Sequence, residues 1–131
     1  MFTPHHVAIS VSDMQASIDF YYLFWFTVFY EYSDENVKIT HLKLGNFLLE
    51  IFCYTDYSLL PKSAVSNKTD LPIIGTKHFA LQVDDIEQAR KFCSNHDIEI
   101  ISEIKQWRTD IMYFFFKDPD DIMVEIVQDN R

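Results

Sequence analysis

Two histidines and two glutamates in this chain have residue types and spacing that suit metal ligands. His6 and His78 each begin an alternating apolar segment, and they lie 72 positions apart. Glu50 and Glu125 each interrupt an otherwise apolar run, and they lie 75 positions apart. A carboxylate in such a run is costly to bury unless it is paired or bound to a metal. Two imidazoles and two carboxylates suit one divalent ion, either six-coordinate Mn, Fe, Co or Ni or else Zn, with positions left for water or substrate.

Each of the four residues also has an ordinary structural interpretation. A single His at a strand start is more often a satisfied polar residue than a ligand, and a single Glu can face solvent from one side of an antiparallel sheet. The repetition favours the metal interpretation, because each half of the chain contributes one His and one Glu at corresponding places. The sequence therefore predicts one metal site that draws ligands from both halves.

The repeat extends to the elements that must position these ligands. Five identical pairs lie 72 positions apart, namely His6/His78, Ala8/Ala80, Val11/Val83, Asp13/Asp85 and Phe20/Phe92. Residues 6–11 and 78–83 alternate as short strands do. In each segment the His and the Ala two places further on share one face, because side chains on a strand repeat every second residue. We expect the other, apolar face to pack on a helix.

The remaining elements follow in the same order in both halves. Ser12-x-x-Gln15 and Asp84-x-x-Glu87 have the capping-box pattern that begins a helix. The strand-like segments that follow are 28–32, 37–43 and 47–54 in the first half, and 98–104, 110–117 and 122–128 in the second. The predicted unit is therefore βαβββ, present twice in an α+β chain that forms a single domain, 1–131. Module 1 spans 1–54 and module 2 spans 76–131, and residues 55–75 form a linker by composition.

Composition narrows the range of functions. The formal charge of −9 and the absence of a basic stripe exclude a nucleic-acid partner. No apolar run is long enough to span a bilayer, and the N-terminal residues lack the features of a signal peptide, so we expect a cytoplasmic protein with no membrane partner. Because the chain shows no export signal, Cys53 and Cys93 are expected to be buried, reduced thiols rather than a disulfide.

Four segments resemble signature segments of the vicinal oxygen chelate superfamily of glyoxalase I, bleomycin-resistance proteins and extradiol dioxygenases. They are HHVAISVSDMQASIDFYY, LLEIF, KHFALQVDDIEQA and KDPDDIMVEIV. The resemblance is closest to small bacterial glyoxalase-I-like proteins and covers nearly the whole chain. It implies two βαβββ modules that form a cupped mixed sheet around one divalent metal ion (Zn, Ni, Co, Mn or Fe). The His, Glu, His, Glu ligand pattern of glyoxalase I falls on His6, Glu50, His78 and Glu125.

The resemblance also implies an activity. In glyoxalase I a thiol hemithioacetal chelates the metal through neighbouring oxygens, and a carboxylate moves a proton between adjacent carbons. Carried over, Glu125 is the catalytic base and Glu50 is its catalytic counterpart. We therefore expect a metal-dependent, glyoxalase-like lyase or isomerase of the lactoylglutathione lyase type, acting on a small oxygenated metabolite. The family's modules and the 16% aromatic content further predict a homodimer, with the site formed either within one chain or across two.

Three alternatives remain open at this point. An Fe(II) dioxygenase uses two His and one carboxylate, so Glu50 would be surplus, as it would be in a metal-dependent thiol transferase. A metal-free ligand-binding or resistance module would use an aromatic cavity instead of metal ligands. Metal content separates an enzyme from a binding module, and oxygen uptake separates a dioxygenase from a lyase.

Two local departures from the family pattern concern loops. Phe24-Trp25-Phe26 replaces a glycine-containing Leu-Gly-Phe, and the Asp-Pro-Asp-Gly turn ends in Asp121, which tolerates a left-handed backbone better than most residues. The minor candidates are His5 as a second-sphere or surface residue, His41 on a strand surface, His96 at a helix end, Tyr113, Phe115 and Phe47 in a cavity lining or core, and Lys105 and Arg108 as anion-holding or surface charges.

Overall fold

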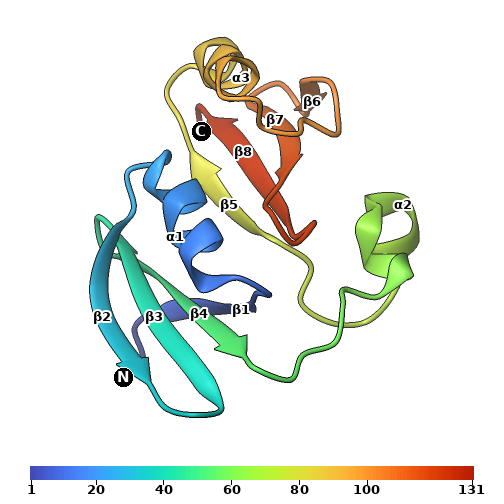
Figure 1. The fold of residues 1–131 in the computed structure, drawn as a ribbon. Coiled ribbons are helices and arrows are strands. Elements are labelled where there is room, and N and C mark those ends of the chain that lie inside the picture. The colour runs from blue at the N-terminus through green and yellow to red at the C-terminus, as the bar shows by residue number, and fades with distance from the viewer. The chain divides into compact units, whose positions relative to one another are not determined.

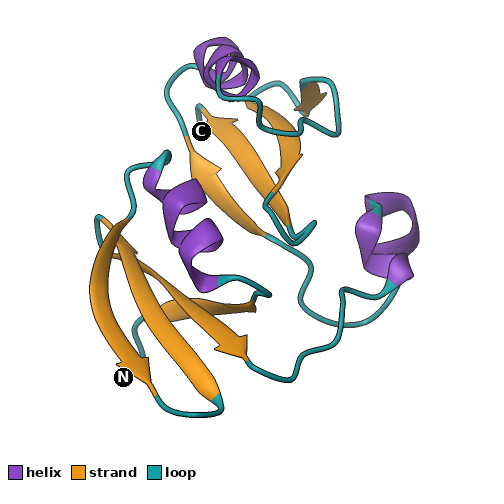
Figure 2. Ribbon diagram, in the orientation of Figure 1, coloured by secondary structure: helices purple, strands orange, loops and turns teal.

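The computed structural model describes all residues, 1–131, and the chain divides into two compact units, Met1–Leu59 and Leu60–Arg131. Each unit contains one four-stranded sheet and one main helix (Figures 1 and 2). The predicted α+β class is therefore confirmed, and the boundary between the units falls inside the predicted linker.

The first unit is a βαβββ module. Its elements are β1 (His6–Ser10), α1 (Met14–Tyr22), β2 (Thr27–Ser33), β3 (Val37–Leu44) and β4 (Phe47–Tyr54). The strand order is β1-β4-β3-β2, with β1 and β4 parallel and the other pairs antiparallel. Helix α1 packs on β3 and β4, and fully buried apolar side chains fill the space between helix and sheet. The largest of them are Tyr21, Phe26, Leu42, Leu49 and Ile51.

The second unit repeats this arrangement after two short helical turns. Its elements are η1 (Lys62–Val65), α2 (Asn67–Asp70), β5 (Phe79–Gln82), α3 (Ile86–Asn95), β6 (Lys105–Trp107), β7 (Ile111–Lys117) and β8 (Met123–Asp129). The strand order is β5-β8-β7-β6, again with the first pair parallel. Helix α3 packs on β8. The core of this second unit contains Ile86, Cys93, Phe114, Phe116 and Val124.

The strand register confirms the repeat. Ala8 on β1 lies beside Glu50 on the parallel strand β4, and Ala80 on β5 lies beside Glu125 on β8. Residues 72 positions apart in the sequence thus occupy equivalent places on the first strands of the two sheets, and residues 75 positions apart occupy equivalent places on the last strands. His6 and Glu50 therefore belong to the two strands of one parallel pair, whereas His78 directly precedes β5, the parallel neighbour of the strand that carries Glu125.

Both main helices begin one residue later than the sequence pattern predicted. The Asp13 carboxylate accepts a hydrogen bond from the Ala16 N–H at 3.0 Å. The Asp85 carboxylate accepts bonds from two backbone N–H groups of α3, each at 3.0 Å. The capping boxes assigned to Ser12 and Asp84 were therefore wrong, because the following aspartate in each half supplies a stronger acceptor for the free N–H groups.

The strand predicted at residues 98–104 was also wrong. Only an isolated bridge between Ile100 and Phe116 forms there, and the edge strand β6 follows it. The Ser102 hydroxyl accepts a hydrogen bond from the Phe115 N–H at 3.0 Å. A side chain thus takes the place of a backbone acceptor and interrupts the regular ladder.

The segment predicted as a linker, 55–75, contains the turns η1 and α2. Ser66 caps α2 by accepting from the Lys68 N–H at 3.3 Å. The Lys77 ammonium donates to the backbone carbonyl of Asp70 at 2.8 Å, which ties the end of α2 to the residue before His78. None of the helices in the chain has the length and apolar composition needed to cross a membrane.

Candidate metal centre

The first module brings His6 and Glu50 together on one face of its sheet. His6 lies two residues before Ala8, the strand neighbour of Glu50, so both side chains project from the same side. The His6 Nε2 atom lies 3.5 Å from Oε1 of Glu50. The Glu50 side chain is 18% exposed and that of His6 is 40% exposed. The pair is therefore accessible at its histidine end and half-buried at its carboxylate.

His41 completes this cluster, although the sequence placed it on a strand surface. It lies opposite Glu50 on the antiparallel strand β3, and its Nε2 lies 2.6 Å from Oε2 of Glu50. The Tyr30 ring, from β2, is 5.5 Å from the His41 ring. The sequence held a signal for this contact. The two-residue turn at Gly45, whose φ of 58° such hairpins require, fixes the pairing of β3 with β4 and so sets His41 opposite Glu50.

His5 contacts the second ring nitrogen of His6, the one that does not face Glu50. Its Nδ1 lies 2.8 Å from Nδ1 of His6, with the two rings edge to face. A hydrogen bond on the second ring nitrogen fixes the tautomer and orientation of a ligating imidazole. The geometry accords with the second-sphere alternative predicted for His5.

The second module brings His78 and Glu125 together in the equivalent place. The His78 Nε2 atom lies 3.1 Å from Oε2 of Glu125, and both side chains are about one-fifth exposed, at 23% and 21%. The Phe115 ring packs edge-on against the imidazole at 4.9 Å. The Nδ1 atom of His78 is buried and has no hydrogen-bond partner.

The donor separations fit coordination of a divalent ion by each pair. Ligand atoms at about 2.1 Å from an ion and at right angles to each other lie about 3.0 Å apart. The two His–Glu separations, 3.1 and 3.5 Å, are close to this spacing. Within either unit, no three His, Cys, Asp or Glu side chains are arranged to hold a metal ion. The four-ligand centre stays a prediction.

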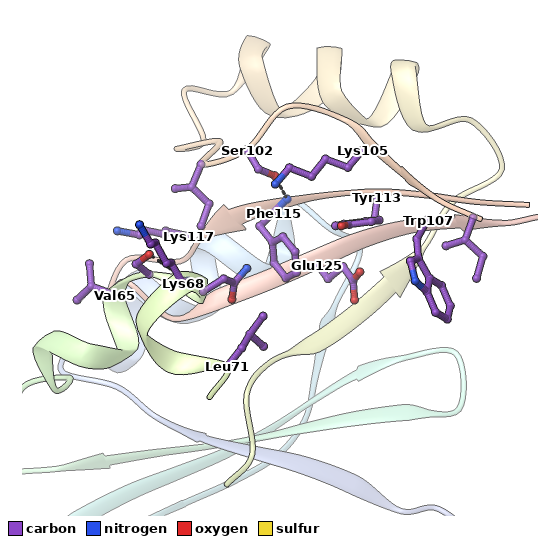
Figure 3. Close-up of a pocket in the computed structure, with 14 residues that line it drawn as sticks. Val65, Lys68, Leu71, Ser102, Lys105, Trp107, Tyr113, Phe115, Lys117 and Glu125 are labelled. Carbon is purple, nitrogen blue, oxygen red and sulfur yellow. Dashed lines mark hydrogen bonds between the residues drawn. The ribbon is translucent and has the colours of Figure 1, made fainter. Parts of the chain in front are cut away.

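A cavity of about 670 Å³ lies in the second unit beside its pair (Figure 3). Glu125, Phe115 and Tyr113 line it, which is the cavity role considered for the two aromatic residues. The strand alternation of β7 places Tyr113 and Phe115 on the face of Glu125, and Phe115 pairs with Glu125 directly across the ladder. The cavity therefore begins at a predicted ligand and extends over an aromatic surface.

The other minor candidates are found in ordinary structural roles or beside the cavity. Lys105 lines the cavity, whereas the Arg108 guanidinium lies over the Trp107 ring at 4.7 Å. Phe47 packs against Phe26 within the first unit, with ring centroids 6.1 Å apart. His96 is the C-cap residue of α3, as the helix-end prediction stated.

The fold and the two pairs define a class of protein, a tandem of βαβββ modules that each present one histidine and one glutamate on the same sheet face. The family model of the Glyoxalase/Bleomycin resistance protein/Dioxygenase superfamily matches residues 3–126, and the chain belongs to this superfamily.

Solved structures agree with this assignment. The glyoxalase family protein from Enterococcus faecalis is 31% identical, with a TM-score of 0.80, and the match covers 95% of this chain and 96% of that one. Two more distant structures share the fold. The trypanothione-dependent glyoxalase I of Leishmania major is 20% identical, with coverage of 98% and 87% and a TM-score of 0.70. The antibiotic-binding protein TnmS3 from Streptomyces sp. CB03234 is 14% identical, with coverage of 98% and 97% and the same TM-score of 0.70. Comparison with curated proteins gave no match.

Proposed function

We propose that this chain is a metal-dependent lyase or isomerase of the glyoxalase type, acting on a small oxygenated compound such as a thiol hemithioacetal. His6, Glu50, His78 and Glu125 would hold one divalent ion. Both His–Glu pairs have donor separations close to those of neighbouring ligands on one ion, which supports this assignment. The superfamily also includes glyoxalase I, as the Leishmania enzyme illustrates.

The single observation that best supports enzyme chemistry is the unequal environment of the two carboxylates. Both oxygens of Glu50 have a histidine partner, at 3.5 Å from His6 and 2.6 Å from His41. Only one oxygen of Glu125 has such a partner, His78 at 3.1 Å, and Glu125 borders the cavity. A catalytic base needs a free oxygen on the substrate side. Glu125 meets this requirement and Glu50 does not.

The chain's own residues then divide the work. Glu125 would accept a proton from a substrate carbon at its unengaged oxygen and return it to the neighbouring carbon. The other oxygen of Glu125 and the Nε2 atom of His78, which lie 3.1 Å apart, would be the two ligand atoms of this module, and Phe115 and Tyr113 would exclude water from the transfer. A bound divalent ion would supply Lewis-acid polarisation of the substrate oxygens. Glu50, held on both sides, would serve as a fixed ligand.

Two variants test this division. The protein loaded with Zn, Ni, Co or Mn should bind about one ion per chain, and His78→Ala should lose most of that affinity. Glu125→Gln should keep part of the metal, because the amide oxygen can coordinate, and should lose turnover of a hemithioacetal panel by at least about a hundredfold, because the amide accepts no proton. Full activity in Glu125→Gln would remove it as the base.

A second candidate function rests on the cavity. Trp107, Tyr113 and Phe115 give it an aromatic lining, which also suits a binding protein that sequesters a planar compound. Absence of bound metal in the wild type after metal loading would favour that function. Oxygen uptake with Fe(II) would instead favour a dioxygenase.

We also propose that the chain forms a homodimer and acts in the cytoplasm. The edge strand β2 is exposed along its whole length, and Val28, Phe29, Tyr30 and Tyr32 are each about half exposed. Exposed apolar side chains on an unpaired sheet edge are typical of an interaction surface. Light scattering at micromolar concentration should give twice the chain mass of 15.6 kDa, and a monomer would contradict the dimer.

A further inference from the structure

The cavity of the second unit has a charge that differs in sign from the rest of the chain. Lys68, Lys105 and Lys117 line it, against a single carboxylate, Glu125. The chain as a whole has 20 acidic and 11 basic residues. Lysines alone attract anions weakly when they are fully solvated, but walls of low polarity strengthen their field. The lining of this cavity is therefore basic in an acidic protein.

The most buried of these lysines has little compensation. The Lys117 side chain is 11% exposed, and its nearest carboxylate, that of the exposed Asp121, lies 4.0 Å away, at the limit of an ion pair. Burying an ammonium group costs free energy unless an anion pairs with it. Lys68 and Lys105 have no ion-pair partner. An anionic ligand would supply the missing partner.

A neighbouring polar atom also lacks a partner. The Asn67 Oδ1 atom is buried without a hydrogen bond, and Asn67 lines the same cavity as Lys68 and Lys117. Buried polar atoms in native structures almost always have a partner, and because an amide oxygen only accepts, a donor group of the ligand rather than its anionic group would supply it here. Figure 3 shows Lys68 and Lys117 toward the end of the cavity bordered by α2, and Lys105 and Trp107 toward the other end. The polar groups thus gather at the α2 end.

The rest of the cavity is aromatic. Tyr113 and Phe115 meet edge to face, with ring centroids 5.9 Å apart, and Trp107 continues this surface. Such rings favour a flat apolar body. We propose that this cavity binds an organic acid with a planar apolar body, its anionic group held by Lys68 and Lys117 and its planar part lying against Phe115, Tyr113 and Trp107. This deepens the proposed function, since Glu125 borders the same cavity, and it assigns the substrate class.

Two fluorescent probes that share one ring type test the proposal without metal or turnover. Anilinonaphthalene sulfonate carries an anionic group, and N-phenylnaphthylamine has the same rings without it. In metal-free, EDTA-treated protein the sulfonate should bind at least about tenfold more tightly than the neutral probe. Lys68→Gln and Lys117→Gln should each weaken the sulfonate about five- to tenfold and leave the neutral probe unchanged.

The control is Lys91→Gln, which removes an exposed lysine on α3 and should change neither affinity. Circular dichroism would verify that Lys117→Gln folds, and the exposed Lys68 gives an independent variant if it does not. Equal binding of the two probes, or sulfonate binding that survives both lysine variants, would overturn the proposal. Loss of metal binding or of turnover with sulfonate binding intact would refute the proposed enzyme function alone.

Discussion

The end of the first helix contains a measurable backbone strain. Trp25 has a φ of 66°, a left-handed conformation that residues other than glycine rarely adopt. It stands where glycine commonly ends a helix, because the Trp25 N–H donates to the Tyr22 carbonyl at 3.0 Å and the Phe26 N–H donates to the Tyr21 carbonyl at 3.3 Å. The second module ends α3 in the same way at Asp97, whose φ is 55°.

Comparing Trp25→Gly with Trp25→Ala isolates this strain, because both changes remove the indole, which is 71% exposed. A Cβ in the left-handed region costs about 1–2 kcal/mol. The greater backbone freedom of glycine in the unfolded chain offsets about 0.5–1 kcal/mol of that. The glycine variant should therefore be more stable than the alanine variant by about 0.5–1 kcal/mol, or about 2–5 °C in Tm.

Urea unfolding followed by circular dichroism measures the difference as a shift in midpoint at constant slope. The matched control is Lys91, an exposed residue in the middle of α3, where glycine should be less stable than alanine by about 1 kcal/mol. The sign must therefore reverse between the two positions. An alanine variant at position 25 as stable as the glycine variant, or more so, would refute the assigned strain.

The other predictions concern the site and the thiols. His41→Leu should release one oxygen of Glu50 and weaken metal binding by about tenfold. His41→Gln can still donate to Glu50 and should retain most of the affinity. Equal affinities of the two variants by titration calorimetry would show that His41 does not position the carboxylate. Burial raises the pKa of the Cys93 thiol to about 11, so at pH 8 it should react with a disulfide reagent far more slowly than the half-buried Cys53; two thiols reacting at one rate would contradict this. His78→Ala should lose metal affinity while keeping its circular dichroism spectrum, and an unfolded variant would mark His78 as structural.

The sequence predicted the repeat, with one His and one Glu in each half, because these features depend on residue identities at fixed offsets. Strand alternation did not show that each His lies beside the Glu of its own half, because that contact depends on the parallel pairing of the first strand of each unit with its last. Residues 98–104 misled because their apolar content suits a strand, while the Ser102 hydroxyl takes an N–H that a strand would need. Composition could not reveal that residues 55–75 form short helices beside a cavity, since that depends on tertiary contacts such as the one between Lys77 and Asp70.

The contact of His41 was missed for a different reason, because a residue on a strand surface acquires a role only from the residue opposite it. In the first module that position facing the glutamate is His41, whereas in the second it is Phe115. The residue before the ligating histidine differs as well. His5 contacts the His6 ring, whereas Lys77 turns to Asp70 and leaves Nδ1 of His78 without a partner.

Because of these differences, Glu50 has a histidine partner at both oxygens and Glu125 at only one, although the two residues occupy equivalent places in the repeated fold. Histidine contacts at both oxygens restrain the Glu50 carboxylate in one position as a ligand. A carboxylate held at one oxygen and bordered by an aromatic cavity keeps the other oxygen available for proton transfer. Replacing Phe115 by His would give Glu125 the second partner that Glu50 has. If the freedom of Glu125 is what permits catalysis, Phe115→His should retain or improve metal affinity while turnover falls at least about tenfold. Unchanged turnover in that variant, with metal bound, would show that the two carboxylates do not differ in this way.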